Sequence, residues 1–187
     1  MKVSKEEMCI KSIELFKEKG YSNVSVSDIC MMFDVTRGSF YHHFEDKGDL
    51  LLYWQKIQSE KNALNPTIEP TNDSLFNLRL FNKQYAEMIS SLGYELLYET
   101  MIATEKKENG SFVIEGSFTL LKASMEQFLA LIEKAQKDEK ITKNISPSVL
   151  AKHYTLALTG LSFDWYEARG GFDFVEEAGS IFNTIFR

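Results

Sequence analysis

The sequence has only two cysteines among its 187 residues, and it contains no long apolar run. Cys9 and Cys30 each stand alone within an apolar pattern, which predicts buried free thiols in a reducing cytoplasm rather than a disulfide framework. A transmembrane helix would need about 18 or more consecutive apolar residues, so none is expected. The opening residues, MKVSKEEM, have no apolar signal-peptide core. We therefore expect a cytoplasmic protein with no membrane partner.

Helix-breaking residues and strand patterns are scarce as well. Only three prolines and ten glycines interrupt the chain, and apolar and polar residues rarely alternate for long. Apolar residues recur at helical spacing instead. The content of 44% hydrophobic and 26% charged residues is ordinary for a globular protein. The pattern predicts an all-α protein of about nine helices.

An excess of positive charge is also missing. The chain carries a net charge of −6, and residues 1–50 contain seven Lys and Arg against nine Asp and Glu. Nonspecific attraction to nucleic acid grows with the number of cations placed against phosphates. Any such contact must therefore depend on a few local cations, among them Arg37 and Lys47. We expect weak nonspecific binding that is sensitive to salt.

Residues 25–47, SVSDICMMFDVTRGSFYHHFEDK, predict two short helices with a tight break between them. Ser25 precedes Asp28 by three residues, the spacing of a capping box at a helix start. Thr36 can cap the second helix, which is too short to be stable alone and is polar, aromatic and basic. This layout is typical of a helix-turn-helix, which places its second helix in the major groove of DNA. The alternative is a solvated surface helix.

Further helices are expected on both sides of this motif. The first covers about residues 4–19, and the fourth covers about residues 47–62. Residues 65–73, NPTIEPTND, contain two of the three prolines and predict a boundary. We therefore expect a DNA-binding domain over residues 1–50, joined by the fourth helix to a helical domain over residues 66–187.

The stretch from about residue 8 to residue 52 resembles the N-terminal domain of the TetR family of transcriptional regulators. The rest resembles that family only in architecture, a divergent helical bundle whose last two helices usually form the dimer interface. The family's fold implies an N-terminal three-helix DNA-binding domain followed by a helical ligand-binding and dimerisation domain. The resemblance rests on these residues: Phe16, Gly20, Tyr21, Val26, Ile29, Val35, Phe40, Tyr41, Phe44, Lys47, Leu50 and Leu51.

Two positions depart from what is common in that family. Asp34 occupies the turn where glycine is frequent, and aspartate tolerates a left-handed backbone better than most residues. Gly38 lies inside the second helix of the motif, where glycine costs roughly 1 kcal/mol relative to alanine. It either allows close approach to DNA or is tolerated because packing holds the helix.

The resemblance also implies which residues contact DNA. Arg37 is expected to read a guanine edge, since its guanidinium can form a forked pair of hydrogen bonds. Lys47 matches a family position that contacts phosphate beside helix N-terminal amides. The adjacent histidines lack further ligands at metal-binding spacing, so no metal is expected. The candidate DNA contacts are Ser25, Ser27, Thr36, Arg37, Gly38, Ser39, Tyr41, His42, His43 and Lys47.

In this family the C-terminal bundle binds a small effector, and the aromatic and methionine residues of the bundle fit an apolar cavity. The same spacing also fits plain core, and this alternative stays open. The candidate ligand-binding residues are Tyr85, Met88, Tyr98, Met101, Met125, Phe128 and Tyr154.

The last two helices carry apolar residues on more than one side. A surplus apolar face on a helix suggests a partner. Two such helices from each subunit would form a four-helix, twofold interface, although burial within the same chain is the alternative. The candidate interface residues are Leu156, Phe163, Val175, Phe182 and Phe186.

Together these patterns favour a homodimeric transcriptional regulator, most readily a repressor. It would bind a pseudo-palindromic site on double-stranded DNA and respond to a small hydrophobic effector. The alternative is a DNA-binding protein of the same fold that has no small effector and is controlled by a protein partner or organises chromosomal DNA. The chain shows no nucleophile–base grouping, metal-ligand spacing or phosphate-binding glycine loop, so an enzyme and a cofactor are not expected.

Overall fold

The computed structural model describes residues 3–64, 72–107 and 119–187, and over these residues it is helical with no strand. The expectation of an all-α chain with about nine helices is confirmed. The predicted linker at residues 65–73 falls mostly outside the described residues. The elements are α1 Lys5–Lys19, η1 Tyr21–Asn23, α2 Val26–Met32, α3 Arg37–His43, α4 Lys47–Leu64, α5 Ser74–Ser90, α6 Tyr94–Lys107, α7 Thr119–Lys137, α8 Pro147–Glu167 and α9 Phe174–Ile185.

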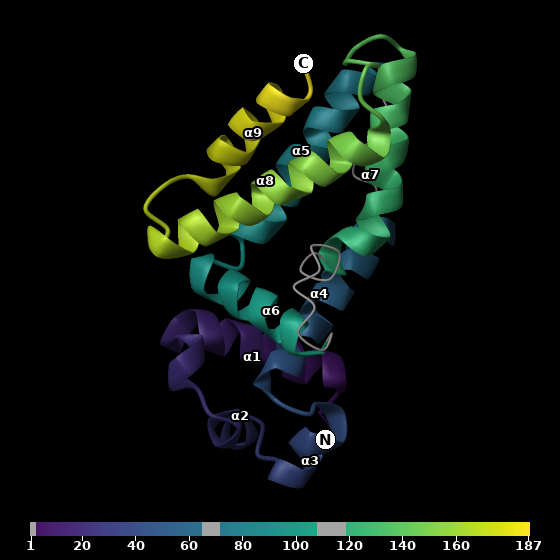
Figure 1. Ribbon diagram of the computed structural model, residues 1–187. Coiled ribbons are helices and arrows are strands. Elements are labelled where there is room, and N and C mark those ends of the chain that lie inside the picture. Colours follow the sequence, from purple (N-terminus) through teal and green to yellow (C-terminus); the bar gives the residue numbers. More distant parts are fainter. Residues whose placement is uncertain (1–2, 65–71, 108–118) are drawn as a thin grey trace.

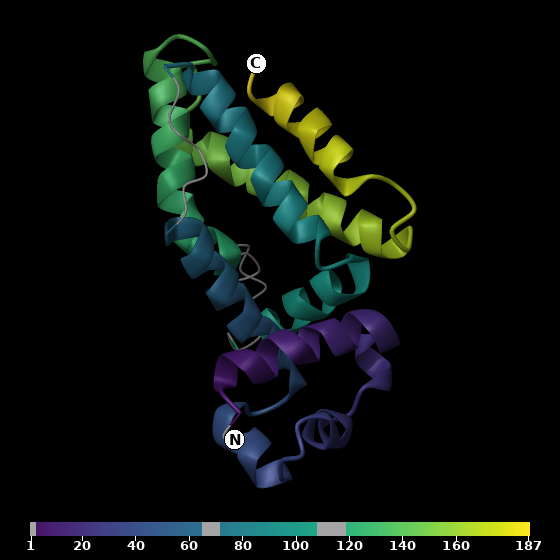
Figure 2. The same cartoon turned by 180° about the vertical axis from the view of Figure 1, so that it is seen from behind.

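The helices form two parts stacked end to end (Figures 1 and 2). The lower part contains α1, α2 and α3, and the upper part is a bundle of α5, α7, α8 and α9. The long helix α4 extends from the lower part upward and packs on α1, α6 and α7. Helix α6 lies between the two parts, above α1 (Figure 1). Any movement of the bundle can therefore reach the lower part through α4 and α6.

Local sequence signals set the helix ends. The side-chain oxygen of Ser25 accepts from the backbone N–H of Asp28, and the Asp28 carboxylate accepts from the Ser25 N–H, so the predicted capping box is confirmed. Ser146 caps α8, with Pro147 at the first position of the helix. Asp34 has φ of 51°, which places the left-handed residue at the predicted turn.

Two hydrophobic cores correspond to the two parts. The N-terminal core is centred on Phe16, Ile29 and Phe40, none more than 1% exposed, and it also includes Leu92 and Leu96 from the start of the α6 region. These two leucines bury apolar surface against the lower part and so hold the start of α6 to it. Burial of this kind stabilises a contact by roughly 25 cal/mol per Å².

The bundle core is strongly aromatic. The rings of Phe81 and Phe128 stack with centroids 5.2 Å apart, and Tyr154 lies 5.5 Å from Phe128. The Tyr154 hydroxyl donates to the side-chain oxygen of Asn82. These rings join α5, α7 and α8 into one packed unit.

Two residues expected at a dimer interface belong to this core instead. Phe182 is 1% exposed and Phe186 is 4% exposed. Their rings contact Tyr154, at 6.1 and 5.6 Å between centroids. Helix α9 packs on α5 and α8, and both phenylalanines are buried against aromatic rings of the same chain, Tyr154 and Phe128.

Both cysteines are buried free thiols, as the sequence predicts. Among the described residues no helix is both long enough and apolar enough to cross a membrane.

Candidate DNA-binding site

Helix α3 packs against the N-terminal core on one side and is exposed to solvent on the other. Phe40 is fully buried beneath it, and Phe44, just after its end, is 2% exposed. On the opposite side Arg37 and His42 are exposed, and Tyr41 is 54% exposed. A seven-residue helix is marginal alone, so this apolar anchor and its cap fix it in place.

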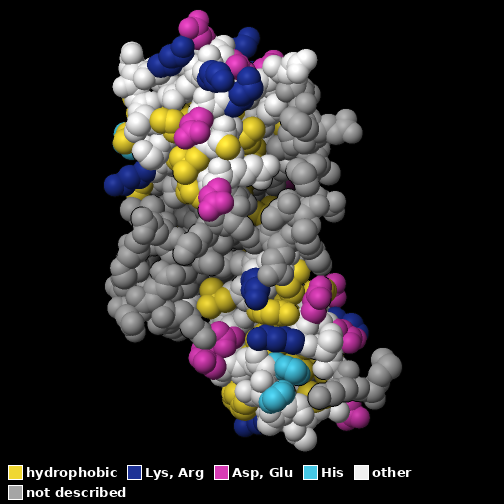
Figure 3. All heavy atoms as spheres, turned by 90° about the vertical axis from the view of Figure 1, so that its right-hand side faces the viewer, with side chains coloured by type: hydrophobic (Ala, Val, Ile, Leu, Met, Phe, Trp, Pro, Cys, Tyr) yellow, Lys and Arg dark blue, Asp and Glu magenta, His cyan; other side chains and the backbone are white. Residues whose placement is uncertain are grey.

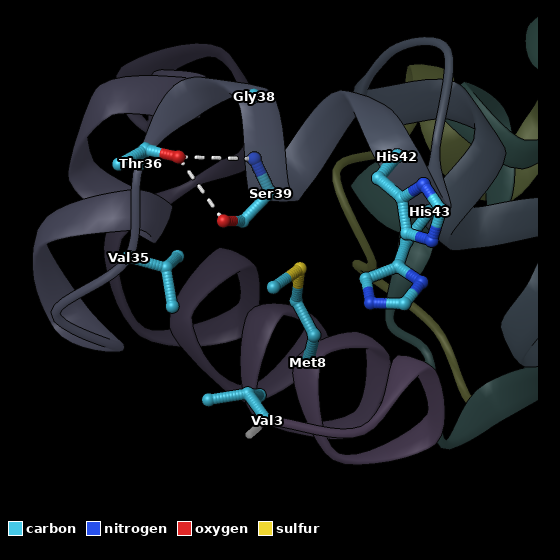
Figure 4. Close-up of a pocket in the computed structure, with 8 residues that line it drawn as sticks. All are labelled: Val3, Met8, Val35, Thr36, Gly38, Ser39, His42 and His43. Carbon is cyan, nitrogen blue, oxygen red and sulfur yellow. Dashed lines mark hydrogen bonds between the residues drawn. The ribbon is translucent and has the colours of Figure 1, made fainter. Parts of the chain in front are cut away.

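The cap of α3 comes from Thr36. Its Oγ1 accepts from the Ser39 N–H at 3.2 Å and lies 3.0 Å from the Ser39 hydroxyl, as the dashed lines in Figure 4 show. The preceding turn is closed by the Val35 N–H, which donates to the Cys30 carbonyl at 3.0 Å. Both contacts are local, so the second helix of the motif begins at a defined angle to the first.

Arg37 is linked to α2 through Ser27. Its Nε and Nη2 atoms donate to the Ser27 hydroxyl at 3.2 and 2.7 Å. This pair joins the starts of the two motif helices on their exposed side. The sequence places both residues among the DNA contacts, and the structure brings them together.

Ser25 is committed to its own helix start. Its hydroxyl lies 2.6 Å from the Asp28 carboxylate, and these hydrogen bonds hold the pKa of Asp28 below its usual value. Ser25 is exposed and still presents its oxygen at the N-terminus of α2, where backbone N–H groups attract anions.

Gly38 has room for a side chain. A Cβ atom there would meet only the Thr36 Oγ1 atom, at an ordinary 3.6 Å. Packing within the described part of the chain therefore does not require glycine.

A hollow of about 510 Å³ lies beside α3, between this helix and the start of α1 (Figure 4). The His42 and His43 rings are 5.1 Å apart at its edge. In the described residues no group of three or more His, Cys, Asp or Glu side chains could hold a metal ion. The residues that line it are Val3, Met8, Val35, Thr36, Gly38, Ser39, His42 and His43.

The charges around this site are mixed. Figure 3 shows histidine side chains beside both basic and acidic side chains on the lower part of one face. No broad basic field surrounds α3 on this face. Binding must rely on a few placed groups, as the net charge of −6 indicates.

A model of bacterial regulatory proteins of the tetR family matches residues 11–53, which include all of the motif described above. The N-terminal part of the chain is therefore similar to the TetR family over residues 11–53. The proteins that it matches are transcriptional regulators and not enzymes.

Individual proteins similar to this chain extend the comparison. The HTH-type transcriptional repressor DhaR of Mycobacterium sp. (strain GP1) is 26% identical over 149 residues, which cover 79% of this chain and 74% of that protein. The transposon Tn10 TetC protein of Escherichia coli is 54% identical over 44 residues, 24% of this chain and 22% of that protein. The regulator FadR from Bacillus subtilis, solved in complex with stearoyl-CoA, has the same fold, with a TM-score of 0.73, 14% identity and 98% of each chain covered.

Lys47 lies within the segment that matches the family model, and its side chain does not simply extend toward solvent. Its Nζ donates to the carbonyls of Tyr21, at 2.8 Å, and Val24, at 2.7 Å, and lies 4.2 Å from the Tyr21 ring centre. Burial lowers the pKa of Lys47. Its ammonium thus binds the chain's own backbone, which no sequence pattern indicated. The expected phosphate contact would have to use its remaining donor.

The candidate effector residues divide into two groups. Three of them, Tyr85, Phe128 and Tyr154, lie inside the bundle core. Burial raises the pKa values of Tyr85 and Tyr154 far above the usual range, so both hydroxyls are neutral. Met88 and Met125 are partly buried against this core.

The other two effector candidates lie on α6. Met101 is 4% exposed, and Tyr98 stacks on Tyr166 of α8 with ring centroids 3.9 Å apart. The Tyr98 ring also meets Phe163 edge-on. These rings attach α6 to α8, so Phe163, expected at the dimer interface, contacts α6 within the same chain.

The remaining interface candidates lie on accessible faces of α8 and α9. Leu156 is 38% exposed, and Val149, which sequence reasoning missed, is 40% exposed. Val175 is partly buried. Gly160 and Gly179 have open space where a side chain would be. The seven-residue spacing from Val149 to Leu156 is the signal that could have identified the first position.

Proposed function

We propose that this chain is a homodimeric transcriptional repressor that binds a pseudo-palindromic site on double-stranded DNA. The observation that carries the proposal is the exposed polar side of α3, with Arg37 held by Ser27 over a buried Phe40 anchor. In a helix-turn-helix dimer, two such helices enter successive major grooves about 34–36 Å apart. We expect Arg37 to read a guanine edge, and the side chains of Tyr41, His42 and His43 to lie along the phosphate backbone. DNA binding by a regulator of this kind places it in the cytoplasm.

The dimer interface is proposed on α8 and α9. Leu156 and Val149 expose apolar side chains along α8. Gly160 and Gly179 lie inside helices, where each costs roughly 1 kcal/mol relative to alanine. Within the part of the chain that the structure describes, no atom lies within 4 Å of where a Cβ would be at either position. A helix of a second copy, packed closely at these glycines, supplies the missing reason and gives a four-helix interface.

The proposed effector is a small apolar molecule bound among the helices of the bundle. The aromatic character of the bundle around Phe128 and Tyr154 supports an apolar ligand, as does the stearoyl-CoA bound by the B. subtilis protein of the same fold. Such a molecule can release DNA only by binding one arrangement of the bundle more tightly than the other. A ligand that binds the native state raises the melting temperature. We would compare stearoyl-CoA with CoA alone.

A rise with stearoyl-CoA and none with CoA supports an acyl effector. If a wider set of apolar compounds also gives no rise, the alternative of control by a protein partner replaces the effector model.

The DNA-binding proposal is tested by footprinting the purified protein on the region upstream of its own gene and of the neighbouring genes. Protection of a short segment with inverted symmetry is expected. Absence of selective protection on all of these regions would reject the repressor model.

A further inference from the structure

Lys47 occupies a junction of three segments rather than an open surface. It is the first residue of α4, and the carbonyls it binds belong to η1 and to the residue that follows it. Val24 immediately precedes Ser25, the cap of α2. One ammonium group therefore joins the start of α4 to the entry of α2, over 23 and 26 residues of sequence.

Helix α6 forms the third side of this junction. A hollow of about 510 Å³ between the two parts is lined by Tyr21 and Lys47 together with Glu99 of α6. Burial lowers the pKa of Lys47, and the Glu99 carboxylate opposes that shift. Burial, followed by the same carboxylate, raises the pKa of Tyr21 to about 12. The charge of Glu99 therefore affects both the Lys47 ammonium and the Tyr21 hydroxyl.

Side chains of α6 also lie close to both segments that Lys47 joins. A Cβ at Gly20, before η1, would lie 3.6 Å from a Glu95 carboxylate oxygen. A Cβ at Gly48, beside Lys47, would lie 3.1 Å from the Ala103 Cβ, tighter than an ordinary contact. A shift of α6 therefore displaces η1 and the start of α4 together.

We propose that Lys47 is a positioning residue, which ties the entry of α2 to α4 and, with Glu99, makes the orientation of the helix-turn-helix follow α6. An ammonium has three donors, and two of them are used by backbone carbonyls. Charged donors form stronger hydrogen bonds than neutral ones. The contribution of Lys47 to DNA affinity then comes through the placement of α2 and α3. Only that last consequence rests on the proposed function.

The first test uses the free protein and amide hydrogen exchange. Lys47→Met should increase exchange roughly ten-fold in residues 21–28, because the two carbonyls lose their charged donor. Lys17→Met removes one exposed cation from α1 and is the matched control, with no change in that segment. Unchanged exchange in Lys47→Met overturns the positioning role.

If Lys47→Met does not fold, Lys47→Arg carries the same test, because a planar guanidinium does not reproduce the compact ammonium. Faster exchange in residues 21–28 is again expected. Wild-type exchange in that variant overturns the proposal.

The second test measures salt dependence on a duplex that the wild-type protein selects from a random pool. Positioning predicts that Lys47→Met weakens binding about ten-fold while the slope of log K against log salt stays unchanged. A lost phosphate contact would instead reduce the slope by about 0.9 per contact, and that result overturns the proposal.

Glu99→Gln should change DNA affinity in opposite directions if Glu99 acts only through its charge or if it helps to position the helix-turn-helix. It removes a negative charge, so simple electrostatics predicts tighter DNA binding. Positioning predicts weaker binding, with faster exchange in residues 21–28, and tighter binding overturns it. If the wild type selects no duplex, the proposed function fails, while the exchange measurements on free protein still decide the role of Lys47.

Discussion

The guanidinium of Arg37 donates two hydrogen bonds to the hydroxyl of Ser27, ten residues earlier in the chain. The contact holds the arginine against the N-terminal turn of α2 before any DNA is bound. A side chain held near one conformation loses less entropy when it binds than a free one does. In the proposed function, Ser27 would thus prepare Arg37 for the major groove in addition to any DNA contact of its own.

Arg37→Ala should remove sequence selectivity without unfolding the protein. A forked arginine–guanine pair contributes about 1–3 kcal/mol of discrimination, so the ratio of specific to nonspecific affinity should fall about ten-fold or more. Competition gel shifts measure this ratio. Arg79→Ala, which removes an exposed arginine from α5, is the control and should bind as the wild type does. Full selectivity in Arg37→Ala would reject its assignment.

Ser27→Ala should give a smaller loss of the same kind, because Arg37 remains but is less constrained. Its effect should disappear in the Arg37→Ala background, as a double-mutant cycle would show. Additive losses would mean that Ser27 acts on DNA independently of Arg37.

Asp34→Ala should destabilise the protein by about 1 kcal/mol, because alanine tolerates the left-handed backbone poorly. Asp34→Gly should restore or exceed wild-type stability, since glycine adopts φ of 51° without steric cost. Urea unfolding measures both. Asp164→Ala, at an exposed helical position of α8, is the control and should change little. A neutral Asp34→Ala would show that the turn does not depend on this residue.

Leu156→Glu should convert the proposed dimer to a monomer, because it places a charge at the centre of an apolar interface. Light scattering after size-exclusion chromatography measures the mass. Met31→Glu is a matched control, since Met31 is 77% exposed and lies on α2, outside the bundle. An unchanged mass for Leu156→Glu would place the interface elsewhere.

Both thiols should react slowly in the folded protein. Burial raises the pKa of Cys9 to about 12 and also raises that of Cys30. A raised thiol pKa lowers the reactive thiolate fraction at every pH below it, so labelling at pH 8 should be slow and should accelerate on unfolding. The labelling rate can be measured with an aromatic disulfide reagent, because its thiolate product absorbs light when a cysteine displaces it. Rapid labelling of either cysteine in folded protein would contradict the burial.

Local signals predicted much of this structure because they act within a few residues. The capping box at Ser25, the cap at Thr36 and the left-handed Asp34 each depend on neighbours within three or four positions. These features required no knowledge of how the helices meet.

Contacts between distant segments were not predictable in the same way. Phe182 matches an interface residue in spacing, but the aromatic neighbours that bury it come from α8 and from its own helix. The carbonyls bound by Lys47 lie more than 20 residues away. Helical periodicity identifies a face of a helix but not the partner that covers it.

Selection from a pool of random double-stranded DNA tests the central proposal most directly. The wild-type protein should enrich an inverted repeat whose half-site centres are about one helical turn, 10–10.5 base pairs, or a small multiple apart, and Arg37→Ala should not enrich it. Recovery of a pool without sequence preference, or of the same repeat by Arg37→Ala, would contradict the account.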